Sequence, residues 1–342
     1  MSSTDLNVPI FNQTPLIREF LSKDSNAPQT LLKYEVLQPS RSFKSRGIGH
    51  LILTRAKEIR AMGNKDVHVF SSSGGNAGYA AAVASSRLGL RCTVVVPVTT
   101  KEHMIQKIRE IGSEVIIKGA HWNEADTYLR EGIIEKLDKS TVEPIYVHPF
   151  DDPLVWEGHS TMVDEIVESL KGDDINLERV KGIICSVGGG GLYNGIMTGL
   201  CRHNLAEQIP VIAVETIGAD TMYQSLKMDK PVVLDGITSV ATSLGSVYIT
   251  ETTFNFAKKY GSKSIALPDK EVMKTSLEFT NLSNFITEPA CAASIHLGYH
   301  PEIIENALGS KLTADDIVII IACGGSTWTY QNLEDGAKKF NL

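Results

Sequence analysis

Short β-branched runs alternate with amphipathic segments of helix length along nearly the whole chain, and this alternation constrains the fold more than any other feature. A strand, a helix and a second strand form the repeating unit of a parallel sheet, because the helix returns the chain to the edge where the first strand began. We therefore expect an α/β protein. Strands are predicted at residues 31–34, 67–71, 92–96, 115–117, 144–147, 182–186, 209–214, 264–267 and 317–323.

The intervening segments have helical periodicity, and one polar turn interrupts the pattern. Residues 148–153, HPFDDP, form a proline-bounded turn that is typical of a crossing between lobes. We expect a smaller domain at 37–150, inserted into a larger domain of residues 1–36 and 151–342. Helices are predicted at residues 47–62, 76–88, 101–110, 123–137, 160–170 and 194–203.

Composition excludes several classes of protein. A net charge of −7 argues against a chain that holds nucleic acid by charge. The five cysteines show neither CxxC nor zinc spacing, which favours a reducing compartment over a disulfide scaffold or a structural metal. The apolar runs are far shorter than the ~20 residues that cross a bilayer, and no basic residue precedes Arg18. We expect a soluble cytoplasmic protein without membrane or nucleic-acid partners.

Four consecutive glycines follow the strand predicted at 182–186: Gly188, Gly189, Gly190 and Gly191, with Leu192 next. Such a run packs nothing, so it is unfavourable unless the backbone is itself the recognition surface. Bare amides at a helix N-terminus bind a dianionic phosphate. The run matches neither GxxxxGK[ST] nor GxGxxG in a first βα turn, which leaves a smaller phosphorylated cofactor. A flexible loop is the alternative.

A second loop follows the strand predicted at 67–71 and contains Ser73, Gly74, Gly75, Asn76 and Ala77. Its hydroxyl, amide and carboxamide groups at a helix start suit a carboxylate. Helix capping is the alternative for each serine.

Lys44 stands in the segment SFKSRG, at the start of the helix predicted to reach Met62. The positive end of the helix dipole, and the loss of solvation beside Phe43, both favour the neutral amine. A neutral lysine is what Schiff-base chemistry needs. Taken alone, Lys44 would be interpreted as a surface lysine, and its weight comes from the two loops described above.

In combination and order, these motifs resemble the fold-type II family of pyridoxal 5'-phosphate (PLP) enzymes, and within it the catabolic L-serine/L-threonine dehydratases of the fungal type. The resemblance covers nearly the whole chain. It implies two open, twisted α/β lobes like those of tryptophan synthase β, with the cofactor in the cleft. The segments that carry it are TPL at 14–16, SFKSRG at 42–47, SGGNAG at 73–78, HPFDDP at 148–153, the glycines, EPAC at 288–291 and CGGS at 323–326.

The resemblance also implies roles for single residues. Lys44 is implied to hold the cofactor as an imine, with Phe43 against its pyridine ring, residues 188–192 on its phosphate and Cys323 facing its ring nitrogen. Because a thiol is a weak donor, Cys323 favours prompt expulsion of the β-substituent over storage of charge in the ring. Ser73, Asn76 and Ala77, with Gly74 and Gly75 between them, are implied to meet the substrate carboxylate and the cofactor 3'-oxygen, and Phe150 to line the substrate pocket.

The implied reaction is β-elimination of L-serine or L-threonine to pyruvate or 2-oxobutanoate and ammonia. Lys44 would remove the α-proton, and the cofactor phosphate would protonate the departing hydroxide. A β-replacement synthase, a serine racemase and an inactive amino-acid-binding relative remain alternatives. A homodimer is expected from the resemblance alone. Arg41, Ala292 and Trp328 depart from the family pattern, and we expect them to alter the rate or the preference rather than abolish activity.

A monovalent-cation site near the phosphate loop is a further expectation from the resemblance. Glu215, Ala219 and the Leu244 carbonyl match its positions, and K⁺ is the expected ion. A capping or solvated carboxylate is the alternative for Glu215.

Overall fold

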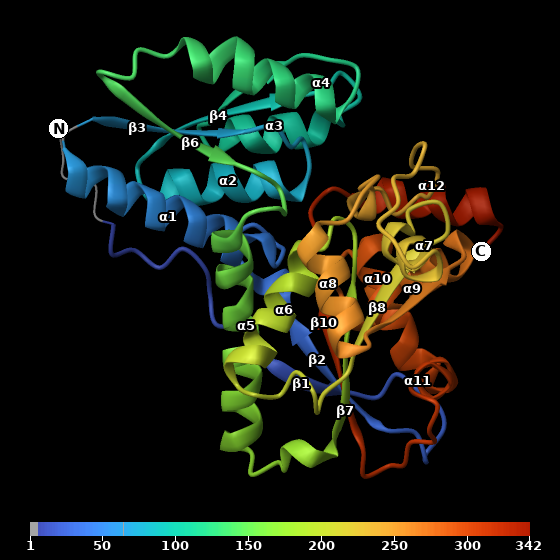
Figure 1. Ribbon diagram of the computed structural model, residues 1–342. Helices are drawn as coiled ribbons and strands as arrows, with labels where there is room; N and C mark the ends of the chain where they lie inside the picture. Colours follow the sequence, from blue (N-terminus) through green and yellow to red (C-terminus); the bar gives the residue numbers. More distant parts are fainter. Residues whose placement is uncertain (1–5, 64) are drawn as a thin grey trace. The chain divides into compact units, whose positions relative to one another are not determined.

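The computed structural model describes residues 6–63 and 65–342, which form two compact units (Figure 1). The smaller unit contains residues 6–12 and 38–159, and the larger contains 13–37 and 160–342. These limits differ from those expected at 37 and 150 in two ways. Residues 6–12 join the smaller unit, because Ile10 packs in its core, and the boundary falls inside helix α5 (Pro153–Gly172), after His159.

The smaller unit is built on a four-stranded parallel sheet in the order β5-β4-β3-β6. All four strands were predicted from the sequence. Because β3 and β6 are neighbouring parallel strands, the loops that follow them begin at the same edge of the sheet. The bounds are β3 (Asp66–Ser71), β4 (Arg91–Val96), β5 (Glu114–Ile117) and β6 (Val142–Val147).

Helices lie on both sides of this sheet (Figure 1), and alternate residues of its strands pack against different sets of them. Val67 and Val69 belong to the core that includes α1, α2 and α3, whereas Phe70 belongs to a smaller core with α4. This alternation is the two-residue period of a strand covered on both faces. The helices are α1 (Lys44–Met62), α2 (Asn76–Arg87), α3 (Glu102–Glu110) and α4 (Trp122–Thr127).

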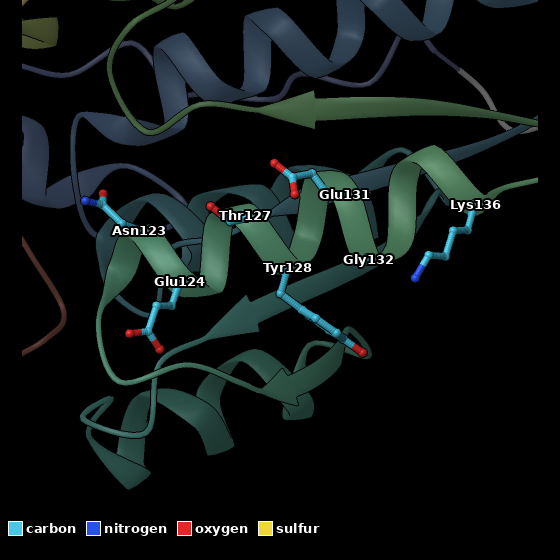
Figure 2. Close-up of a pocket in the computed structure, with 7 residues that line it drawn as sticks. All are labelled: Asn123, Glu124, Thr127, Tyr128, Glu131, Gly132 and Lys136. Carbon is cyan, nitrogen blue, oxygen red and sulfur yellow. The ribbon is translucent and has the colours of Figure 1, made fainter.

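The helix predicted at 123–137 is not a single α-helix, which corrects that prediction. After α4 the chain passes through a π-helix, Tyr128–Ile133, and a 3-10 turn, Ile134–Lys136. Gly132 has weak helix propensity, and the two isoleucines after it disfavour regular α geometry. Figure 2 shows this segment and the pocket along it, with Tyr128 extending away from the backbone.

The larger unit is built on a six-stranded sheet in the order β1-β2-β10-β7-β8-β9. Five strands are parallel and were predicted. The sixth, β1 (Leu16–Glu19), pairs antiparallel with β2 at the edge, and its four residues alternate too weakly to be predicted. The other bounds are β2 (Gln29–Tyr34), β7 (Val180–Ser186), β8 (Val211–Thr216), β9 (Lys263–Leu267) and β10 (Ile317–Ala322).

One helix of the larger unit, α10, has no polar face. Every residue from Pro289 to Gly298 is buried, as expected for a helix enclosed by protein on all sides. The bounds of the helices in this unit after α5 are α6 (Gly191–Arg202), α7 (Thr221–Lys227), α8 (Glu251–Tyr260), α9 (Asp269–Ser283), α10 (Pro289–Tyr299), α11 (Pro301–Leu308) and α12 (Tyr330–Phe340), with 3-10 turns at Glu35–Leu37, Leu177–Arg179 and Thr242–Leu244.

Within residues 6–63 and 65–342, no helix combines the length and the apolar character needed to cross a membrane.

Candidate active site

In the larger unit, three of the predicted site segments leave neighbouring strands at the same sheet edge. Cys323 follows β10, the glycines follow β7, and Glu215 lies near the end of β8. These strands are consecutive in the sheet and parallel, with Ile320 opposite Ile184 and Ser186 opposite Val214. The strand order changes direction between β10 and β7, which is where open α/β sheets bind ligands.

Two positions of the glycine loop, Gly188 and Gly190, leave little or no room for a side chain. A Cβ on Gly190, whose φ is 98°, would lie 1.9 Å from the Thr253 hydroxyl, and one on Gly188 would lie 3.0 Å from the Leu244 carbonyl. Behind the loop, the Thr253 hydroxyl donates to Asn194 Oδ1 over 2.9 Å, and the Asn194 carboxamide donates to Thr250 over 3.0 Å. The loop is therefore held rigidly at the N-terminus of α6, where helix amides lack carbonyl partners within the helix. This cradle fits a phosphate dianion.

Cys323 is a buried, neutral thiol. The neighbouring Cys291 thiol and burial raise its pKa well above the ordinary value. Beyond it, the buried carboxylate of Glu288 accepts hydrogen bonds from the amide and hydroxyl of Thr327 over 2.5 and 2.8 Å, and from Ser243 Oγ over 2.7 Å. Glu288 thus joins the segment after Cys323 to the turn beside Leu244. The EPAC motif marked Glu288 as part of a family segment, but its hydrogen-bond partners are distant in sequence.

Glu215 is fully buried and caps the start of α7. Its carboxyl accepts the amides of Met222 and Tyr223 over 2.8 and 2.7 Å, and the Ser264 hydroxyl over 2.8 Å. Burial raises its pKa to about 8, although these hydrogen bonds act in the opposite direction. All three donors are neutral groups.

In the smaller unit, Lys44 begins α1 as predicted. Its Nζ donates to the Pro149 carbonyl over 2.6 Å and lies 5.1 Å from the centroid of the Phe43 ring. Pro149 follows β6 and the serine loop follows β3, so neighbouring strands bring both segments to one edge of the sheet. Phe150 is half-buried beside Pro149. The smaller unit therefore groups Lys44 and Phe150 with the serine-loop segment.

The serine loop separates buried from accessible groups. Ser72 is fully buried, whereas residues 73–76 are half-buried. A Cβ on Gly74 would lie 2.4 Å from the Thr100 hydroxyl, and one on Gly78 would lie 1.7 Å from the Ser73 carbonyl. Residues 73–76 thus form an accessible edge of the loop, in which the backbone is closely packed and the Ser73 and Asn76 side chains are half-buried.

Two histidines, the fully buried His159 and the half-buried His148, support this edge, although neither was selected from the sequence. His159 Nδ1 accepts the Gly47 amide over 3.1 Å, and its ring centroid lies 4.8 Å from that of Phe43. His148 Nδ1 accepts the Asp151 amide over 2.8 Å and the Phe150 amide over 3.3 Å. Burial lowers the pKa of both, to about 4 for His148. Nothing in the sequence indicated the His159 contact, because Gly47 lies 112 positions away. The partners of His148 are local and lie in the HPFDDP turn, but a histidine in a turn is not specific enough to be selected.

Replacing His148 with asparagine is expected to flatten the acid dependence of stability. The imidazole pKa in the folded chain, about 4, lies below the ordinary 6.5. Its contribution is therefore present above pH 6.5 and is lost as the pH falls from 6.5 toward 4. Asparagine retains an acceptor near Nδ1 but does not titrate. Urea titrations at pH 7 and pH 5 should show the wild type losing roughly 1 to 2 kcal/mol more than His148→Asn. The exposed His121→Asn is the control, and equal losses in His148→Asn and wild type would contradict the assignment.

The three departures from the family pattern lie in different surroundings. Arg41 is exposed and has a φ of 63°, the left-handed region in which a residue without a Cβ is favoured. Ala292 is fully buried in α10. Trp328 is half-buried, and a Cβ on Gly336 of α12 would lie 3.5 Å from its ring.

Comparison with known proteins identifies close relatives. The family described as "Pyridoxal-phosphate dependent enzyme" matches residues 9–324. The catabolic L-serine/threonine dehydratase of Saccharomyces cerevisiae is 56% identical over 326 residues, which are 95% of this chain and 90% of that protein. An L-serine dehydratase of Dictyostelium discoideum is 33% identical over 97% of this chain and 93% of its own length.

Solved structures agree with these relatives. A fungal L-serine ammonia-lyase from Rhizomucor miehei superposes with a TM-score of 0.84 at 29% identity, covering 97% of this chain and 99% of that one. A threonine deaminase isoform 2 from Solanum lycopersicum gives 0.80 at 25% identity, covering 96% and 83%. The predicted fold class is confirmed by these structures.

Proposed function

Because the chain belongs to the pyridoxal-phosphate dependent enzyme family, we propose that it is a PLP-dependent L-serine/L-threonine ammonia-lyase. It eliminates the β-hydroxyl group and releases pyruvate or 2-oxobutanoate with ammonia. The observation that carries the proposal is the 56% identity, over 95% of the chain, to a catabolic L-serine/threonine dehydratase. The same identity favours elimination over β-replacement, racemisation or binding without chemistry.

The residues present fit the cofactor. The amides of Gly188, Gly189, Gly190 and Gly191, with Leu192, would hold its phosphate, because Cβ atoms at Gly188 and Gly190 would meet Leu244 and Thr253. Cys323, as a neutral thiol, would face the ring nitrogen without placing a charge on it. When bound, PLP supplies an aldehyde for amines and an aromatic ring that withdraws electrons from the amino-acid α-carbon.

The chain's own residues then bind the substrate and move its proton. Lys44 Nζ would be the amine that carries the cofactor, and as a free amine it would take the α-proton as general base. Phe43, braced by the His159 ring, would lie against the pyridine ring. Ser73, Asn76 and Ala77 would contact the substrate carboxylate, and Gly74 and Gly75 would let the backbone between them approach it closely. Asn76 would also contact the cofactor 3'-oxygen. Phe150 would line the substrate pocket.

The test is a product assay on purified protein loaded with PLP. L-Serine alone should yield pyruvate and ammonia in equal amounts, and L-threonine should yield 2-oxobutanoate. Product that appears only when a thiol is added would instead identify a synthase. Recovery of D-serine without pyruvate would identify a racemase, and bound cofactor with no product would identify a binding protein.

We also propose that K⁺ binds at Glu215, Ala219 and the Leu244 carbonyl. Glu215 is a buried carboxyl whose three hydrogen-bond donors are neutral, and burial raises its pKa to about 8. A bound cation would stabilise its ionised form. Replacing K⁺ with tetramethylammonium is expected to lower the turnover rate of the wild type several-fold. The same replacement is expected to leave the turnover rate of the Glu215→Gln variant unchanged. Turnover that is independent of potassium would remove the proposal.

We also propose that the chain forms a homodimer, as the resemblance implies, and that it works in the cytoplasm, as its cysteine usage favours. Sedimentation of the holoenzyme, together with fractionation of cells that express it, tests both parts.

A further inference from the structure

A buried carboxylate behind the serine loop has no part in the reaction described above. Asp126 lies on α4 and is 5% exposed. Its Oδ1 accepts hydrogen bonds from Ser72 Oγ over 2.7 Å and from the Tyr146 hydroxyl over 2.6 Å. Its Oδ2 accepts Arg130 Nε over 2.8 Å. Three donors from three different segments therefore converge on one carboxylate, all within the smaller unit.

The network is suited to holding a fixed geometry. Burial and the Asp126 carboxylate raise the pKa of Tyr146, so its hydroxyl keeps its proton and donates throughout the range in which an enzyme works. Asp126 lies on α4, which packs on the sheet that contains β3. Tyr146 lies near the end of β6, the strand that pairs with β3 in the same sheet. Ser72, the residue directly after β3, is thereby tied to two elements of the domain core.

Ser72 is connected to the substrate-facing edge through backbone alone. Its side chain is fully buried, so the hydroxyl cannot serve the substrate. The next residue, Ser73, begins the accessible edge. The backbone of this edge is closely packed, because Gly78 lies against the Ser73 carbonyl and Gly74 lies against Thr100. A change in how Ser72 is held must therefore move the amides and hydroxyl of residues 73–76. Such supporting contacts decide how well a binding group is preorganised.

We propose that Asp126 and Tyr146 are positioning residues: by fixing Ser72, they hold residues 73–77 in the conformation that binds the substrate carboxylate. This inference rests on the proposed function, because it takes that loop to be the carboxylate site. The carboxylate is bound equally in the ground state and the transition state, so loosening its site should raise KM and leave kcat nearly unchanged.

Tyr146→Phe tests the proposal with the loss of one oxygen atom. KM for L-serine should rise about tenfold, the size expected for a lost hydrogen bond to a charged group, while kcat stays within about twofold. The matched control is Tyr128→Phe, on the neighbouring π-helix, whose ring contacts Lys118 and extends away from the segment in Figure 2. The control should retain the wild-type KM.

A binding measurement separates this role from general loss of structure. L-Alanine carries the carboxylate but has no leaving group, whereas ethanolamine lacks the carboxylate. Titrating PLP-loaded protein with each, followed by cofactor absorbance, should show about tenfold weaker alanine binding in Tyr146→Phe and Ser72→Ala, with ethanolamine unchanged. Because both variants break the same network, the double variant should lose much less than the product of the two single effects.

The outcomes distinguish the two levels of proposal. Wild-type protein that binds PLP but converts neither amino acid would remove the proposed function. Wild-type protein that makes pyruvate, together with a Tyr146→Phe variant whose KM and alanine affinity equal those of Tyr128→Phe, would overturn the positioning role alone. Equal weakening of alanine and ethanolamine would also overturn it, since the loop would then not be recognising the carboxylate.

Discussion

Lys44→Ala is expected to abolish elimination, with pyruvate release at least about a thousandfold below wild type, because we propose that Lys44 supplies both the amine that carries the cofactor and the base that takes the α-proton. In the wild type, Lys44 Nζ donates a hydrogen bond to the Pro149 carbonyl and lies beside the Phe43 ring. The visible absorbance band of the lysine-linked cofactor should disappear as well. Continuous lactate dehydrogenase-coupled assay of pyruvate and a spectrum of the purified protein measure the two effects.

Two variants show whether the loss is specific to this amine. Lys44→Arg keeps the positive charge but cannot form an imine, and it should be as inactive as the alanine variant. Lys57→Ala removes an exposed lysine from the same helix and should retain activity. A Lys44→Ala protein that still releases pyruvate at more than about a tenth of the wild-type rate would refute the role of Lys44.

Gly190→Ala is expected to weaken PLP binding by about a hundredfold or more. The new Cβ would lie 1.9 Å from the Thr253 hydroxyl, and the backbone φ of 98° is strained for any residue with a side chain. Relief requires the loop to move away from the N-terminus of α6, where the phosphate would bind. Dialysis against graded PLP concentrations, with bound cofactor measured by absorbance, gives the dissociation constant.

Gly261→Ala is the matched control for backbone strain without a collision. Gly261 ends α8 with a φ of 63°, and a Cβ there would meet nothing within 4 Å. This variant should lose about 1 kcal/mol of stability and keep wild-type PLP affinity. If both glycine variants bind PLP equally well, the loop at Gly190 is not the phosphate site. A Thr253→Ser, Gly190→Ala double variant should stay impaired, because the serine Oγ retains the atom that collides.

The regular elements were predictable because their signals are local. The two-residue period around Val67 and Val69 and the glycines after β7 could be located from the chain itself. Such patterns predicted nine of the ten strands found in the described residues. The strand β1 was missed because four residues at a sheet edge carry too little alternation. The helix predicted at 123–137 was wrong in kind, since periodicity does not distinguish α from π turns around Gly132.

The sequence by itself determined the α/β class, the order of the motifs and the identity of the lysine and glycine segments, since each of these is written in neighbouring residues. Only the tertiary structure decided which buried groups support them. Asp126 meets Ser72 from 54 positions away and Tyr146 from 20, and Glu288 meets Ser243 from 45. Those pairs exist because helices and turns pack against the ends of strands from other parts of the chain: Asp126 reaches its partners from α4, and Ser243 reaches Glu288 from a 3-10 turn. Hydrogen bonds require contact in space rather than proximity along the chain.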